Sequence, residues 1–260
     1  MKQCKTVAMV NKLNGINWDY YLHRLIFQDN SEIKIWKKLE NNCYIGTLGY
    51  SENNINILMV LLQSFAEQYG EEIDYESARE ELMLYCMRGK LFVYFDENMR
   101  PVSMNGVTYN EDNVSVEFDK GNGERINSLY FYGLSTIPEY RGRGACGELI
   151  KFAIEYAFYN NFDLVYARTD LVGSKSERLM RRAGMDICME DEKIITEWVQ
   201  VTDDKGDYRL HLWLPLKDGI SLYGKGEALY ADGYTREVEI GKKLEKRRKN
   251  EEVYNWWRCI

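Results

Sequence analysis

The sequence predicts a mixed α/β domain with an extension at each end. Three observations carry this prediction: two consecutive segments with helical spacing, a series of alternating strands, and a glycine-rich turn that opens a further helix. The chain has 260 residues, 45% of them hydrophobic and 29% charged, which is the composition of a protein that buries a core rather than of a disordered one.

The first half of the predicted domain begins after an N-terminal extension, residues 1–42. Within that extension, residues 32–36 alternate like a strand. The domain starts with a short strand at residues 43–49. Two helices follow, and each is preceded by a residue that can cap its first turn, Ser51 and Asp74.

The second half of the predicted domain is built mainly from strands and ends at residue 215. Residues 216–260 then form a charged, partly helical C-terminal extension. In chain order, the predicted elements are strands at 91–95, 102–109, 114–118 and 129–137, a glycine-rich turn at 141–147, a helix at 149–157, a strand at 164–168, a short basic helix at 176–183, and a hairpin of 194–201 with 208–214.

Composition excludes several classes of function. A net charge of −7 argues against bulk nucleic-acid binding and favours cationic small molecules or basic protein segments as partners. The two histidines, His23 and His211, are too few for a three-histidine zinc site, and the six cysteines include no C-x-x-C pair, so we expect no metal. No apolar run is long enough for a signal sequence or a membrane span, so we expect a cytoplasmic protein with no membrane contact.

The stretch from Leu129 to Gly147 carries the chemistry. A strand ends near Pro138, and glycines then open a helix whose first main-chain amides have no partner within the helix. Gly142 and Gly144 lack a Cβ, so an anion can approach the main chain closely at this positive end of the helix dipole. Two arginines, at 141 and 143, add permanent positive charge. These features together predict a site for a pyrophosphate, although an ordinary β-to-α turn with solvated arginines is the alternative.

Two other phosphate-binding motifs fit less well. A Walker loop requires Lys and Ser or Thr after its glycines, whereas Gly147 is followed by Glu148. The spacing of Gly142, Gly144 and Gly147 matches the dinucleotide pattern G-x-G-x-x-G. However, no clear acidic strand end follows at the distance expected in a parallel βαβ unit, since the next strand ends in Arg168-Thr169-Asp170. A nucleotide-dependent oxidoreductase therefore stays as a distant alternative.

The same stretch resembles the GNAT family (Gcn5-related N-acetyltransferases). The resemblance lies in Arg141-x-x-Gly144-x-Cys146 after Pro138, and in Leu-Met-Arg-Arg-Ala-Gly-Met at 179–185, which is similar to the family's closing motif. It covers about residues 43–215 in element order and is specific over 129–185. It implies a mixed, mostly antiparallel sheet with helices on both faces.

The resemblance also implies a function: transfer of an acetyl group from acetyl-CoA, or another acyl-CoA, to an amine by direct attack. The acceptor is a small molecule or a protein, and the N- and C-terminal extensions either cap the acceptor groove or form a homodimer. In this family, the glycine loop holds the pyrophosphate and the preceding strand offers main-chain groups to pantetheine and to the oxyanion. The implied cofactor-binding residues are Leu134, Ser135, Thr136, Arg141, Gly142, Arg143, Gly144, Ala145, Cys146 and Gly147.

The chain departs from the family pattern at two positions. Cys146 stands where Gly or Ala is usual, and it is more simply a small buried residue than a nucleophile. Met180 stands where the family often has the tyrosine that protonates the departing thiolate, and a thioether has no proton to give. Tyr132 and Tyr166 are candidate acid or base groups on flanking strands, with simple packing as the alternative role. A catalytically weak module that binds acyl-CoA or a protein partner is therefore the second functional hypothesis.

Overall fold

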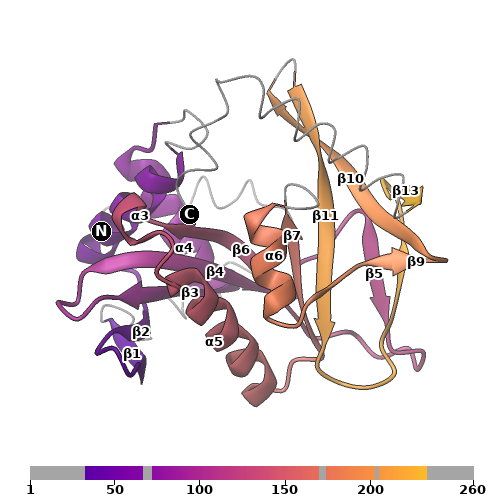
Figure 1. The fold of residues 1–260 in the computed structure, drawn as a ribbon, viewed down its shortest axis with the longest axis horizontal. Coiled ribbons are helices and arrows are strands. Elements are labelled where there is room, and N and C mark those ends of the chain that lie inside the picture. Colours follow the sequence, from indigo (N-terminus) through magenta and orange to yellow (C-terminus); the bar gives the residue numbers. More distant parts are fainter. Residues whose placement is uncertain (1–32, 67–71, 170–173, 203–204, 233–260) are drawn as a thin grey trace, which may run out of the picture.

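The computed structural model describes residues 33–66, 72–169, 174–202 and 205–232. The predicted N-terminal extension up to residue 32, His23 and the predicted helical part of the C-terminal extension lie outside these ranges. The described part forms one large mixed sheet with helices packed against it (Figure 1).

The main sheet has 11 strands, and nine of them follow in the order β1-β2-β3-β4-β6-β7-β11-β10-β13. Its pairs are antiparallel except that of β6 with β7. A separate two-stranded sheet joins β5 to β12. The strands are β1 (Lys34–Lys38), β2 (Tyr44–Thr47), β3 (Gly89–Phe95), β4 (Pro101–Tyr109), β5 (Val116–Asp119), β6 (Ser128–Thr136), β7 (Leu164–Thr169), β8 (Asp186–Ile187), β9 (Met189–Glu190), β10 (Lys193–Thr202), β11 (Lys205–Pro215), β12 (Ser221–Gly224) and β13 (Leu229–Asp232).

The helices begin where the sequence predicts caps. The Asp74 carboxylate accepts from the amide of Ser77 at 2.7 Å, and the Ser51 hydroxyl accepts from the amide of Asn54 at 3.2 Å. Ser174 caps the last helix in the same way, by accepting from the amide of Glu177. The helices are α3 (Glu52–Ala66), α4 (Tyr75–Arg88), α5 (Ala145–Tyr159) and α6 (Lys175–Arg182), with a 3-10 turn, η1 (Pro138–Tyr140), before α5.

Helices cover both faces of the sheet, which confirms the predicted fold class. Phe92 of β3 packs against Phe152 and Tyr156 of α5, with ring centroids 5.1 and 5.2 Å apart. Gly106 of β4 pairs with Leu91, the residue before Phe92, and successive residues of a strand face opposite sides of the sheet. Gly106 therefore faces the side away from α5, where the ring of Tyr85 from α4 lies against it. Figure 1 shows α5 and α6 in front of the sheet.

The sheet continues past both limits predicted for the domain. Before residue 43, β1 pairs with β2, and after residue 215, β13 pairs with β10 while β12 pairs with β5. A domain drawn at residues 43–215 would cut through these hydrogen-bonded pairs.

The contact between Tyr85 and Gly106 gives a test of the packing. A Cβ on Gly106 would overlap the Tyr85 ring, so Gly106→Ala is expected to lower the free energy of unfolding by about 1–3 kcal/mol, which is typical of overpacking. Urea denaturation measures the change. As a control, the Cβ of Gly147→Ala in α5 would lie 3.8 Å from Leu179 Cδ1, so this helical substitution is expected to be neutral or stabilising by up to about 1 kcal/mol. Equal stability of Gly106→Ala and the wild type would show that the ring does not lie on this strand.

Candidate active site

The sheet opens between β6 and β7. The two parallel strands stay in register only from Ser128 to Phe131, and beyond this point no described strand pairs with β6 on that side. On its other side, β6 stays paired with β4 but shifts register, because Gly106 pairs with Tyr132 whereas Met104 pairs with Ser135. This shift is a β-bulge that leaves Gly133 and Leu134 opposite one residue, with Gly133 at φ +61°. The opening exposes one edge of β6 to hydrogen bonding with an extended ligand.

The glycine loop lies just beyond this open edge. Gly142 and Gly144 have positive φ values of 76° and 89°, a backbone region that glycine adopts without steric cost. Gly144 is the N-cap of α5 and has no capping side chain, so the first amides of α5 have no partner within the helix. A Cβ built on Gly144 meets no atom of the described residues within 4 Å, so the space beside this glycine is open among them. Unpaired amides at the positive end of the helix dipole favour an anion at this position.

Three neighbouring contacts hold the loop in this shape. Arg141 donates through Nε to the main-chain oxygen of Thr136 at 3.0 Å, which ties the loop to the end of β6. Tyr140 donates to the carboxylate of Asp96, and the guanidinium of Arg143 lies 4.8 Å from the Tyr140 ring. Although burial opposes it, hydrogen bonding from Tyr140 and from main-chain amides lowers the pKa of Asp96. Asp96 is therefore a charged anchor for the turn.

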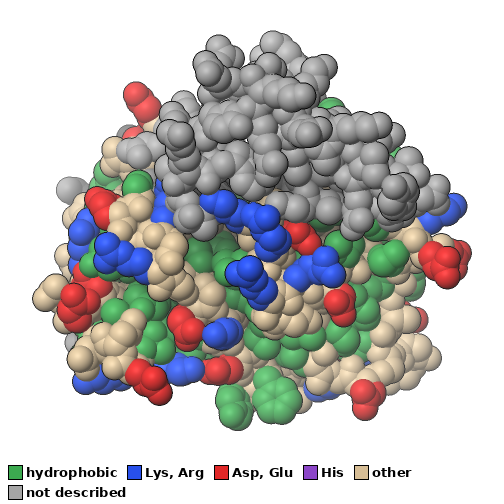
Figure 2. Space-filling view, in the orientation of Figure 1, with side chains coloured by type: hydrophobic (Ala, Val, Ile, Leu, Met, Phe, Trp, Pro, Cys, Tyr) green, Lys and Arg blue, Asp and Glu red, His purple; other side chains and the backbone are tan. Residues whose placement is uncertain are grey.

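Positive charge gathers around the start of α5 although the whole chain is acidic. In Figure 2, Lys and Arg side chains cluster on the face where Figure 1 places α6 and the start of α5. Arg143 and three arginines of α6, Arg178, Arg181 and Arg182, are exposed. Exposed cations at a helix N-terminus favour a multiply charged anion there.

Cys146 packs beneath the loop, against two hydroxyl groups. Its thiol lies 2.9 Å from the hydroxyl of Thr136 and 3.6 Å from that of Ser103. Burial raises the pKa of the Cys146 thiol in spite of these hydrogen bonds, so the thiolate is disfavoured. The geometry agrees with a small packing residue at this position.

The two candidate tyrosines differ in their exposure to solvent. Tyr132 follows Phe131, the last residue of β6 that pairs with β7, and is 41% exposed. Burial of the rest of the side chain raises its pKa to about 12. Tyr166 is 1% exposed, and its hydroxyl lies 3.2 Å from Nδ1 of His211. Since a group that exchanges protons with a substrate must reach it, the geometry favours Tyr132 over Tyr166.

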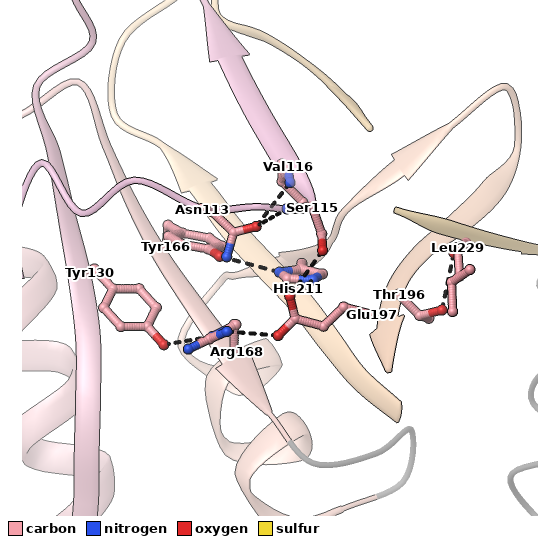
Figure 3. A network of polar contacts seen from close by, with 10 residues as sticks. All are labelled: Asn113, Ser115, Val116, Tyr130, Tyr166, Arg168, Thr196, Glu197, His211 and Leu229. Carbon is pink, nitrogen blue, oxygen red and sulfur yellow. Dashed lines mark hydrogen bonds and ion pairs between the residues drawn. The ribbon is translucent and has the colours of Figure 1, made fainter. Parts of the chain in front are cut away.

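A buried polar network borders the opening on the far side of β7 (Figure 3). Arg168 of β7 donates to the hydroxyl of Tyr130 at 3.0 Å and to Glu197 of β10 at 2.7 Å. Glu197 also accepts from Ser115 at 2.9 Å, and its carboxylate lies 3.7 Å from Nε2 of His211. The network joins β6, β7, β10 and β11 to the segment before β5, so it makes this side of the opening rigid.

Two features of the site carried no clear signal in the sequence, the bulge in β6 and the position of the α4 face. The only sequence feature that indicates the bulge is a glycine within a predicted strand, Gly133. Tyr85 and Glu81 of α4 lie on the same side of the sheet as Tyr132, and the Tyr85 and Tyr132 rings are 5.9 Å apart. Sequence spacing shows that Glu81 and Tyr85 share a helix face, but not that this face meets the opening. Met180, at the position of the family's tyrosine, is 4% exposed and packs in the main core.

His211 gives a prediction for stability against pH. Burial lowers its pKa from 6.5 to about 4, so it folds as a neutral imidazole. Below pH 6.5, the unfolded chain binds a proton that the folded chain does not, so stability is full above that pH and falls as the pH drops towards 4. Linkage gives a loss of about 2–3 kcal/mol by pH 4.5.

Urea denaturation at pH 7.5 and 4.5 measures this loss. His211→Asn keeps an acceptor for the Tyr166 hydroxyl but cannot titrate, so we expect its acid-induced loss to be smaller than that of the wild type. If both proteins lose the same free energy, His211 is not the group responsible.

Comparison with known proteins assigns the domain to a family. Residues 59–185 match the model of the "Acetyltransferase (GNAT) family". These residues contain the second half of α3, all of α4, the split between β6 and β7, the glycine loop and α6. The chain therefore carries a GNAT acetyltransferase domain. A search of curated proteins finds no match.

Solved structures share the fold at low sequence identity. The ribosomal-protein-alanine N-acetyltransferase from Brucella melitensis aligns with a TM-score of 0.51 and 16% identity over 66% of this chain and 98% of its own. A GNAT-family acetyltransferase from Bacillus anthracis aligns at 0.50 and 12% identity, over 70% and 98%. A chain of the NatC complex bound to Gag peptide and CoA aligns at 0.50 and 15% identity, over 68% and 99%. The described strands and helices thus form a complete GNAT fold.

Two further findings concern the described residues only. None of their helices is both long and apolar enough to pass through a membrane. The same ranges contain no group of three or more His, Cys, Asp or Glu side chains placed to hold a metal ion.

Proposed function

We propose that this protein is an N-acetyltransferase that uses acetyl-CoA and transfers the acetyl group directly to an amine. The observation that carries the proposal is the open edge of β6, which leads straight into a glycine loop at the start of α5. Acetyl-CoA joins an extended thioester arm to a diphosphate. The open edge of β6 offers main-chain groups to the arm, and the start of α5 offers helix amides to the diphosphate.

In this proposal, the residues expected from the sequence hold the cofactor. The amides of Gly142 to Gly147 and the cations of Arg141 and Arg143 receive the diphosphate, while Leu134 to Thr136 offer main-chain groups to the pantetheine arm. The bulge before them directs β6 amides towards the developing oxyanion, a type of stabilisation worth about 3–4 kcal/mol in other enzymes. Acetyl-CoA supplies the activated acyl group.

The acceptor side is the face of the sheet that carries α4 and Tyr132. An amine, free or on a protein, reaches the opening between α4 and the buried network around Arg168. Two of the structural neighbours are named for a protein or peptide, the ribosomal-protein-alanine N-acetyltransferase and the NatC complex with a Gag peptide. Their likeness supports an amine on a protein as the first class to test. Cytoplasmic location and a homodimer stay predictions.

The glycine loop can be tested with two nearly identical substitutions. Gly144→Asp places a carboxylate against the diphosphate, whereas Gly144→Asn has the same shape and the same strain at φ +89° without the charge. We expect calorimetry to show acetyl-CoA affinity at least about 30-fold weaker for the aspartate than for the asparagine, which corresponds to about 2 kcal/mol. Equal affinities would place the diphosphate elsewhere.

Activity decides between an enzyme and a binding module. Full-length protein is mixed with acetyl-CoA and each of three amines: alaninamide, a lysine-containing peptide and spermidine. Release of free thiol that depends on the amine supports the acetyltransferase. Tight binding of acetyl-CoA without thiol release for any amine would favour the module that binds without turnover. Binding of NAD(P)H but not of coenzyme A would favour the oxidoreductase.

A further inference from the structure

Arg168 lies at the opening between β6 and β7, across from Tyr132. The pairing of the two strands ends at Phe131 and Ala167, so Tyr132 of β6 and Arg168 of β7 are the first residues beyond it. Because side chains alternate along paired strands, these two residues face the same side of the sheet. For Tyr132 this is the side that carries α4. The two side chains therefore flank the opening on the acceptor side.

Two partners fix the guanidinium of Arg168. Its Nε donates to the hydroxyl of Tyr130 at 3.0 Å, and its Nη1 donates to the carboxylate of Glu197 at 2.7 Å. Both partners are buried, and Glu197 is itself held by Ser115. A guanidinium that is already held in one orientation loses little further freedom when it binds a ligand.

Part of Arg168 is left for a ligand. Its side chain is 37% exposed, and the hydrogen bonds that it makes with described residues use Nε and Nη1, which leaves Nη2 for a further acceptor. A buried ion pair adds little net stability, because the loss of hydration offsets the attraction of the two charges. Ligand binding gives a reason for an arginine, rather than an apolar residue, at this point of β7.

The charges around the opening favour an ammonium group and disfavour a carboxylate. Glu197 already balances the charge of Arg168. Burial, the charge of Glu81 and, more weakly, that of Glu111 raise the pKa of Tyr132 to about 12, so both carboxylates act on the opening. A ligand that carried a further negative charge would be repelled by them. A neutral oxygen, such as that of a carbonyl, can accept from Nη2 without this repulsion.

We propose that Arg168 selects the acceptor by binding a neutral carbonyl oxygen next to the reacting amine, so that the acceptor is the α-amine at the start of a peptide or protein chain. The inference rests on the acetyltransferase function proposed above and names the class of amine. In such an α-amine, the carbon that carries the nitrogen also carries the carbonyl. The side-chain amine of lysine and the amines of spermidine have no carbonyl at this position.

Three small amines test the selection with the full-length protein. Alaninamide has the neutral carbonyl, alanine has a carboxylate in its place, and 2-aminopropane has a methyl group there. Thiol release from acetyl-CoA gives kcat/KM for each, expressed per concentration of unprotonated amine. We expect the wild-type value to be at least about tenfold higher with alaninamide than with either of the others. An equal or lower value with alaninamide would overturn the inference.

Arg168→Lys keeps a positive charge beside Glu197 but loses the planar fork. We expect kcat/KM with alaninamide to fall at least about tenfold, while that with 2-aminopropane changes less than about threefold and acetyl-CoA affinity stays within about twofold by calorimetry. Arg125→Lys changes an exposed arginine before β6, at the end of the strand away from the opening, and should behave as the wild type. Equal losses with both amines in Arg168→Lys would make Arg168 a structural residue only.

A second variant keeps the test decisive if Arg168→Lys does not fold, which urea denaturation would show. Arg168→Met combined with Glu197→Gln removes both charges of the pair, so that no buried charge is left without its partner. We expect this double variant to lose the preference for alaninamide over 2-aminopropane. A folded double variant that keeps the preference would overturn the inference.

The failure of the inference can be told apart from the failure of the proposed function. If the wild type releases thiol without preferring alaninamide, it is an acetyltransferase in which Arg168 does not select the acceptor. If it releases no thiol with any amine, the proposed function fails, and calorimetry of alaninamide with the protein in the presence of CoA tests Arg168 directly. Binding that Arg168→Lys loses would then support the carbonyl site, and no binding to the wild type would overturn it.

Discussion

The parting of β6 from β7 after Phe131 is the constraint on which the rest of the site depends. Parallel strands pair through evenly spaced hydrogen bonds, and here that pairing stops while both strands continue. The bulge at Gly133 and Leu134 keeps β6 attached to β4 as it turns away. One strand edge is thereby left open inside the sheet, and the chain leads from this edge into the amides of α5.

Both sides of the opening are held rigid by polar contacts. On the β6 side, Arg141 ties the glycine loop to Thr136, and Asp96 holds the turn through Tyr140. On the β7 side, the buried carboxylate of Glu197 pairs with Arg168. Loss of this pair would leave a buried charge without a partner and would lower stability. Reacting groups that bind in an opening with rigid sides lose less conformational freedom on reaching the reactive geometry than groups in a flexible opening.

The packing of α4 connects the fold to the chemistry. Two glycines, on β4 and β6, leave room for the Tyr85 side chain, and the contact that fills the core also places the hydroxyl beside Gly133. The acidic character of the whole chain does not oppose an anionic ligand, because arginines from α6 and the loop gather on the opposite face of the sheet. In the proposed function, acetyl-CoA and the amine therefore approach the opening from different faces of the sheet.

The sequence by itself determined the order of the longer helices and strands between residues 43 and 215, the helix caps at Ser51 and Asp74, and the glycine loop. These features depend on residues close together in the chain. The domain limits could not be read in this way, since β1 and β13 are defined by their partners across the sheet. The order of strands, the end of the β6–β7 pairing and the meeting of Tyr85 with Gly133 were decided only by tertiary structure. Each of them joins residues far apart in sequence, and local spacing carries no information about such contacts.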